Sequence, residues 1–293
     1  MNKTVALRIT TAFLSACLII SCVLSLSSCA CFGGMCGNFE DIFSSILPFN
    51  YEEYTVTDED LMTGSLVLAD VDHPYTVDIS NLDLVERCQE YRNNQLIADG
   101  LEVTKANYPY FAYAGMQLTT PAMEAAHRML SDAKAAVGQD AVTIDAAYGI
   151  IYNIYNADCD EEFKTGNLMF ISDYTSEPTN HVPLSKEYRQ WLDENAYKYG
   201  FIESYRDAYR FVGVAHAKLM KEMKITSLAD YIEYLKKNTN ADMIISIKVG
   251  NEEYSVYYVA CKAGDKVKVP SGADYTISGT NEGGIVVTFR SDK

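Results

Sequence analysis

Residues 191–220 carry the clearest structural signal in the chain, with the sequence WLDENAYKYGFIESYRDAYRFVGVAHAKLM. Apolar positions recur at helical spacing in the first part of this stretch. We expect that helix to begin at Ser185 and to stop at Tyr199-Gly200-Phe201, because glycine favours the left-handed conformation that closes a helix. A second helix is expected from about Tyr209 to Met223.

The same patterns extend to both sides. Thr120 and Pro121 are residue types that favour a helix start, and apolar residues then recur at helical spacing as far as Gly138. Ser227, with Asp230 three residues later, predicts a capping box that opens another helix. Short apolar runs predict buried strands over 65–68, 141–147 and 168–171.

The pattern changes after Asn240, where β-rich runs alternate with glycine-containing turns. We therefore predict an α+β domain over residues 61–240 and a small β-rich module over 241–293. Residues 30–60 are glycine-rich at first and then acidic, which predicts a tether with ordered structure beginning near Leu61. The expected strands of the module span 243–249, 254–260, 267–269, 275–278 and 285–289.

The first 29 residues have the features of a targeting segment. Lys3 and Arg8 precede an uncharged apolar stretch that ends at Leu26-Ser27-Ser28-Cys29. That ending resembles a bacterial lipobox, which predicts lipidation of Cys29. A competing match ends at Cys22, and an uncleaved membrane helix is the other alternative. Each alternative places the rest of the chain outside the cytoplasm, at the membrane.

Composition excludes several classes of protein. With 48% hydrophobic and 22% charged residues among 293, the chain is globular rather than disordered. Its formal net charge of -16 argues against nucleic-acid binding, which needs a basic face. The eight cysteines form no disulfide framework, although Cys31 and Cys36 could bridge in an oxidising compartment.

The block from Thr165 to Leu235 contains four recognisable motifs: Trp191-Leu192 with Asn195-Ala196, Lys198-Tyr199-Gly200-Phe201, Tyr209-Arg210-Phe211-Val212-Gly213 with His216-Ala217, and Ser227-Leu228-Ala229-Asp230-Tyr231-Ile232. By these motifs the block resembles the VanY-like D-alanyl-D-alanine carboxypeptidases, which are zinc peptidases that trim peptidoglycan stem peptides. The resemblance implies a VanY/Hedgehog-like D,D-peptidase fold over roughly residues 62–293.

The resemblance fails at the catalytic positions. The family binds zinc through Ser-x-His-x-x-Gly-x-Ala-x-Asp and a later Glu-x-x-His, whose Glu is the general base. Aligned on Thr165-Gly166, the first His position holds Phe163 and the Asp position holds Phe170. The Glu position holds Tyr205 and the second His position holds Ala208. A benzyl ring or a methyl group cannot coordinate zinc, and all four catalytic positions are replaced, so we expect no zinc cofactor and no catalysis.

Other residues could take over the lost substrate-binding and metal-binding roles. The family's substrate-orienting Arg falls near Tyr148, so we expect Tyr148, Tyr205 and Arg210 to line a remnant groove. The alternative of an active enzyme requires displaced ligands, drawn from His181, His216 and Asp173. We expect each of the four histidines, which include His73 and His127, to be a loop, surface or packing residue instead.

Three hypotheses follow for function. The first is a non-catalytic protein on the extracytoplasmic face of the membrane that binds a peptidoglycan peptide or an envelope protein. The second is an active D-alanyl-D-alanine carboxypeptidase or peptidoglycan hydrolase with displaced zinc ligands. The third is a structural interaction protein that acts through the β-rich module at 241–293.

Overall fold

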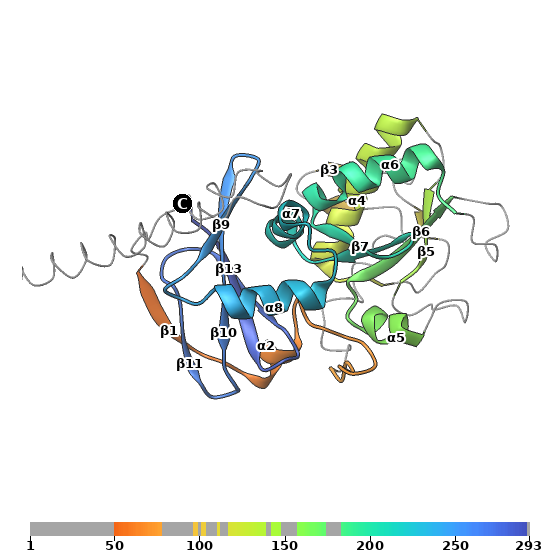
Figure 1. The fold of residues 1–293 in the computed structure, drawn as a ribbon. Coiled ribbons are helices and arrows are strands. Elements are labelled where there is room, and N and C mark those ends of the chain that lie inside the picture. The colour runs from red at the N-terminus through yellow and green to blue at the C-terminus, as the bar shows by residue number, and fades with distance from the viewer. Residues whose placement is uncertain are drawn as a thin grey trace, which may run out of the picture. The chain divides into compact units, whose positions relative to one another are not determined.

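The computed structural model places the described residues in one compact unit, Asp41–Lys293. Figure 1 shows the elements of this unit. The expected lipidation site Cys29, the Cys31–Cys36 pair, Tyr148 and His181 lie outside the described residues. The structure describes residues 50–77, 96–98, 101–103, 110–111, 117–138, 142–147, 157–173 and 183–291.

A five-stranded sheet organises the first part of this unit, with strand order β4-β5-β6-β8-β7. β4 and β5 are parallel, and the other neighbours are antiparallel. The strands expected over 141–147 and 168–171 are present as β5 and β6, and β6 is buried along most of its length. The strand bounds are Tyr110–Phe111 for β4, Val142–Ala146 for β5, Leu168–Asp173 for β6, Phe201–Tyr205 for β7 and Ala208–Phe211 for β8.

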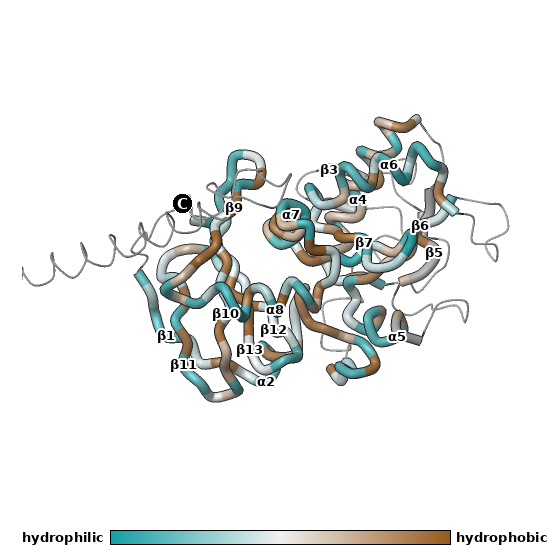
Figure 2. The backbone as a smooth tube through the Cα atoms, viewed as in Figure 1, coloured by the Kyte–Doolittle hydropathy of each residue, from teal (hydrophilic) through white to brown (hydrophobic). Residues whose placement is uncertain are grey.

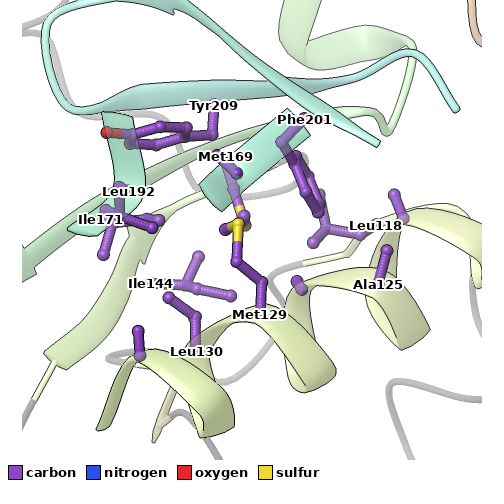
Figure 3. Close-up of a cluster of buried hydrophobic side chains, with 14 of the residues drawn as sticks. Leu118, Ala125, Met129, Leu130, Ile144, Met169, Ile171, Leu192, Phe201 and Tyr209 are labelled. Carbon is purple, nitrogen blue, oxygen red and sulfur yellow. The ribbon is translucent and has the colours of Figure 1, made fainter. Parts of the chain in front are cut away.

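Helices cover both faces of this sheet. On one face lie α4 (Thr120–Val137) and α6 (Lys186–Asn195), and on the other lies α5 (Ala157–Lys164) (Figure 1). Alternation along β6 explains the division, because Met169 packs against α4 whereas Leu168 packs against α5. Figure 3 shows Met129 of α4 beneath Met169 and Ile144 of the sheet.

The predicted helix boundaries are largely confirmed. α4 has Pro121 near its start, and Gly138 closes it in the left-handed conformation. Ser185 caps α6 by accepting a hydrogen bond from the amide of Tyr188, and a 3-10 turn, η3 (Ala196–Tyr199), follows. Ser227 accepts from the amide of Asp230 at the start of α8 (Leu228–Asn238).

The helix expected from Tyr209 begins later. Residues 208–211 form β8, and α7 spans Val214–Met223. The φ of Gly213 is 88°, which lies outside the helical range, so the chain turns there from strand into helix. Tertiary pairing with β6 and β7 therefore overrides the local helical pattern of residues 209–212.

The β-rich part is confirmed strand by strand. β12 (Tyr275–Gly279), β13 (Gly284–Arg290), β10 (Glu252–Ala260) and β9 (Ile245–Val249) form an antiparallel sheet in that order. Figure 2 shows hydrophobic positions on these strands and on α7. One buried cluster contains residues from both sides of position 240: Leu219 and Met220 of α7, Tyr231 and Leu235 of α8, Ile245, Val256 and Val286.

The tether expected over residues 30–60 was wrong at its C-terminal end. β1 (Tyr51–Thr55) pairs with β11 (Lys266–Pro270), and α2 (Asp58–Met62) follows. Thr57 and Asp60 form a full capping box at α2, which the acidic composition concealed. Ordered structure thus begins at least ten residues before Leu61, in a strand of the β-rich part.

The strand expected at residues 65–68 was also wrong. Leu66 and Val67 are fully buried, but their backbone follows a turn rather than a strand ladder. The amide of Leu66 donates to Ser278 Oγ, and the amide of Leu68 donates to the carbonyl of Thr280. The apolar run therefore indicated burial but not a strand. The amides of Leu66 and Leu68 find hydrogen-bond acceptors without pairing in a sheet.

Candidate functional site

The four positions aligned with the family's zinc ligands and catalytic base come together in one apolar cluster. Phe163, Phe170 and Ala208 are buried in it, and Tyr205 packs against it from β7. The rings of Phe163 and Phe170 are stacked with centroids 5.6 Å apart. Cys159 and Leu168 complete the cluster. The sequence thus fills this position with aromatic and aliphatic carbon.

Strand register and one turn explain why these residues meet. Phe170 lies opposite Ala208 across the β6–β8 pair. A bulge in the β7–β8 pair places Tyr205 opposite the same Ala208. The turn at Thr165 and Gly166, with φ of 67° at the glycine, brings Phe163 at the end of α5 back over β6.

The residues present do not fit a zinc ion. Zinc in proteins is held by thiolate, imidazole or carboxylate groups, typically three protein ligands in a catalytic site. The aligned positions offer two benzyl rings, a methyl group and a phenol. Within the described ranges, no cluster of three or more His, Cys, Asp or Glu side chains has a geometry able to hold a metal.

A buried ion pair lies beside the apolar cluster, and sequence reasoning missed it. Arg210 is 0% exposed, and its Nη1 lies 3.2 Å from Oε1 of Glu162. Its Nη2 donates to the carbonyls of Ser65 and Val67 at 3.3 and 3.0 Å. Burial lowers the pKa of Arg210, and the charge of Glu162 opposes that shift. The pair therefore ties α5, β8 and the 65–67 segment together.

The remnant groove expected from Tyr148, Tyr205 and Arg210 needs correction. Arg210 is fully enclosed because Glu162 and two carbonyls occupy its guanidinium, so it does not line an open surface. Tyr205 is half-buried and does line an open pocket of about 420 Å³. Its other lining residues are Arg189, Glu203, Ser204 and Arg206.

The arginines of this open pocket differ in their freedom to bind. Arg189 makes a bidentate contact with Asp207, with Nη1–Oδ1 at 2.5 Å and Nη2–Oδ2 at 2.9 Å. This hydrogen bonding raises the pKa of Arg189. The side chain of Arg206 is 79% exposed and lies 4.0 Å from Asp207. Arg206 is thus the cation of the pocket that solvent and a ligand can reach.

The described histidines do not converge on a metal position. His216 is buried, with Nδ1 2.9 Å from the Tyr231 hydroxyl and Nε2 2.9 Å from Thr288 Oγ1. Burial lowers its pKa to about 3, so it is neutral. His73 lies 2.8 Å from Asp70, and His127 is half-buried on α4 with its pKa lowered by burial. The displaced-ligand set loses His216, because both of its ring nitrogens are engaged inside the protein.

Comparisons with known proteins find sequence similarity over part of the chain. No protein-family model matches the sequence. A D-alanyl-D-alanine carboxypeptidase from Enterococcus faecium is 34% identical over 112 residues, which cover 34% of this chain and 35% of that protein. The chain thus spans about a third of the length of this curated relative.

A solved structure extends the similarity to the fold. The vancomycin-resistance D,D-dipeptidase VanXYg, crystallised with a D-Ala-D-Ala phosphinate analogue, matches with a TM-score of 0.61 at 17% sequence identity. The match covers 82% of this chain and 99% of the dipeptidase. The chain therefore shares the α+β fold of this D,D-dipeptidase and is similar in sequence, over 112 residues, to a D-alanyl-D-alanine carboxypeptidase.

Proposed function

We propose that this chain is a non-catalytic member of the D,D-peptidase fold that binds a peptidoglycan stem peptide at the outer face of the cell membrane. One observation carries the proposal. The aligned zinc and base positions hold Phe163, Phe170, Tyr205 and Ala208, which pack together as carbon. A polar centre that activates water has no counterpart there, because neither ligand nor base is present.

The ligand is inferred from the relatives and from the open pocket. Both relatives carry D-alanyl-D-alanine or its analogue in their names, and such a peptide ends in a carboxylate. Arg206 presents an exposed guanidinium beside Tyr205, whose ring offers a flat apolar face. A terminal carboxylate at Arg206 and a D-alanine methyl group on Tyr205 suit this chemistry.

The membrane location rests on the sequence of the first 29 residues. Among the residues that the structure describes, no helix is sufficiently long and apolar to span a bilayer. Mass spectrometry of the mature N-terminus distinguishes lipidation at Cys29 from a retained leader. An envelope protein as ligand, or binding through the β-rich module, remains the competing hypothesis for the partner.

The test uses the full chain and a stem-peptide mimic, diacetyl-Lys-D-Ala-D-Ala. We expect no release of D-alanine with or without added zinc, and saturable binding in calorimetry. Arg206→Gln should weaken binding about tenfold, because a charge-assisted contact is lost. Lys198→Gln, an exposed charge change on η3, is the control and should leave the affinity unchanged.

Two results contradict the proposal. Zinc uptake in a 1:1 ratio together with turnover of the mimic would establish an active peptidase. Absence of binding to the mimic would remove the stem peptide as ligand.

A further inference from the structure

A second pocket lies on the other face of the central sheet, among α6, η3, β7 and α7. Its volume is about 530 Å³, within the range of small-molecule sites, roughly 300–1,000 Å³. The apolar cluster at Phe163 packs under α5, whereas this pocket is on the side of Phe201 and Tyr209. Its apolar wall is formed by Leu192, Ala196, Phe201, Ala217 and Met220.

The buried hydroxyl of Tyr209 is the notable polar group of this pocket. Tyr209 lines the pocket and is 1% exposed, and its hydroxyl has no hydrogen-bond partner among the described residues. Figure 3 shows its oxygen directed away from Phe201, on the side of Leu192. An unpartnered buried hydroxyl is destabilising, and a ligand that supplies the partner relieves that penalty.

The charges nearest this hydroxyl are mainly negative. Burial raises the pKa of Tyr209, and Glu203, Asp193 and Asp207 raise it further, against Arg189. Of these carboxylates, Asp207 is already paired with Arg189. Oε1 of Glu203 lies 3.9 Å from Nη1 of Arg189 and accepts a hydrogen bond from the amide of Asp207 at 3.1 Å, and burial raises the pKa of Glu203. Glu203 and Asp193 both line the pocket, so a cation at the hydroxyl would find two carboxylates nearby.

Two lysines, Lys221 and Lys224, line the pocket as well. Lys221 Nζ donates to the main-chain carbonyl of Asp193 at 2.9 Å and lies 5.9 Å from the Tyr197 ring centroid. Lys224 also lines the pocket but is exposed to solvent. The ammonium of Lys221 is thus bonded to the main chain of Asp193, and the Asp193 carboxylate forms no ion pair among the described residues.

We propose that this pocket binds a primary amine with an apolar body. The ammonium group is held by the Tyr209 hydroxyl, as acceptor, and by the carboxylates of Glu203 and Asp193. The apolar body packs against Phe201 and Met220. A fitting ligand is a hydrophobic amine or the free N-terminus of a peptide that begins with an apolar residue. The pocket shares Glu203 with the pocket beside Arg206, but its other lining residues are different, and its occupation does not require stem-peptide binding.

The experiment titrates hexylamine into the full chain carrying methyl-labelled methionine, with hexanoate and hexanol as probes of equal length. We expect hexylamine to shift the methyl resonance of Met220 saturably and to leave that of the exposed Met243 unchanged. Hexanoate should bind at least about tenfold more weakly, because it places a like charge beside two carboxylates.

Variants separate the polar contacts from general hydrophobic binding. Glu203→Gln combined with Asp193→Asn should weaken hexylamine binding about tenfold, and Tyr209→Phe should weaken it several-fold, by about the value of one hydrogen bond. Glu194→Gln, beside Asp193 but outside the pocket lining, is the matched control. Equal binding of hexanoate, no shift at Met220, or no effect of the double variant would each overturn the proposal.

Discussion

Two buried neighbourhoods lie side by side on one face of β8, and they differ in chemistry. Ala208 belongs to the all-carbon cluster of Phe163 and Phe170, whereas Arg210, two residues along the strand, forms an ion pair with Glu162. The first position packs against aromatic and aliphatic side chains. The second holds a full charge at 0% exposure with a carboxylate and two carbonyls around its guanidinium.

The comparison shows how one fold accommodates polarity in its interior. A charge is tolerated inside where fixed internal partners surround it, as at Arg210, whose Nη1 and Nη2 are bonded while its Nε has no partner among the described residues. At the positions aligned with the metal ligands of the zinc peptidases, this sequence has Phe163, Phe170 and Ala208. These side chains fill the space by packing against one another. The ion pair joins α5 and β8 through charged groups, whereas the cluster beside it joins α5, β6 and β8 through apolar side chains. Each of the following predictions tests one side of this contrast.

The largest effect is expected from breaking the ion pair. Glu162→Leu leaves Arg210 buried without its counter-charge and should lower the free energy of unfolding by about 3–5 kcal/mol. The double variant Glu162→Leu with Arg210→Met should be more stable than either single variant, because no buried charge is left unpaired. Urea unfolding at pH 7 measures all three. Strictly additive losses would contradict the pairing.

Removing a ring from the apolar cluster should have the next largest effect. Phe163→Ala leaves a cavity between α5 and β6 and should cost about 3–4 kcal/mol in unfolding free energy, whereas Phe163→Leu should cost less than about 1.5. Addition of zinc should not stabilise Phe163→His, because Phe170 and Ala208 provide no further ligand. A rise in melting temperature of that variant with zinc would show that a metal site persists.

His216 is a buried polar group whose two side-chain partners, Tyr231 and Thr288, are neutral, and it predicts that the free energy of unfolding depends on pH. His216 has a pKa of about 3 in the folded chain, lowered by burial, against about 6.5 when unfolded. Below pH 6.5 the unfolded state takes up a proton that the folded state does not, so stability falls as pH falls. From pH 7 to 5 we expect a loss of about 2 kcal/mol from this residue.

The measurement compares urea unfolding of the native chain and of His216→Gln at both pH values. The Gln side chain can still contact Tyr231 and Thr288, but it does not titrate. The difference in stability between pH 7 and 5 should therefore shrink in the variant. An unchanged difference would mean that other groups, chiefly carboxylates, account for the dependence.

The smallest effect concerns the edge of the ion pair. Ser204 Oγ donates to Oε1 of Glu162 at 3.3 Å in a partly buried position. Ser204→Ala should lower the unfolding free energy by about 0.5–1.5 kcal/mol. In the Glu162→Leu background the same change should have almost no effect, and a persistent loss there would show that Ser204 acts through another contact.

Local signals were enough to predict α4, α6 and the strands of the β-rich part. Their periodicity, caps and turn glycines lie within each element, as at Gly138 and Ser227. The errors arose where a distant partner determines the structure. β8 is a strand because β6 and β7 pair with it, and β1 is ordered because β11 pairs with it. Sequence patterns near those residues contain no record of these partners.

The residues of the candidate site also fall into those that sequence motifs predicted and those that they did not. The motif spacing predicted which residues occupy the catalytic positions, and the structure brings those four together. It did not predict that Arg210 is enclosed, because Glu162 lies 48 positions away and looks like one of many acidic residues. Nor did it predict the pocket at Tyr209, whose walls come from separate helices and strands.

The pairing of β1 with β11 has a consequence for the order in which the chain can fold. Lys266 and Glu53, which meet across this pair, are 213 positions apart in the sequence. During synthesis, residues 51–55 have no strand partner until residues 266–270 have been made. Such a distant closure is slow. The β-rich part is therefore completed last, and a nascent chain truncated before residue 266 leaves β1 with an open edge that invites aggregation.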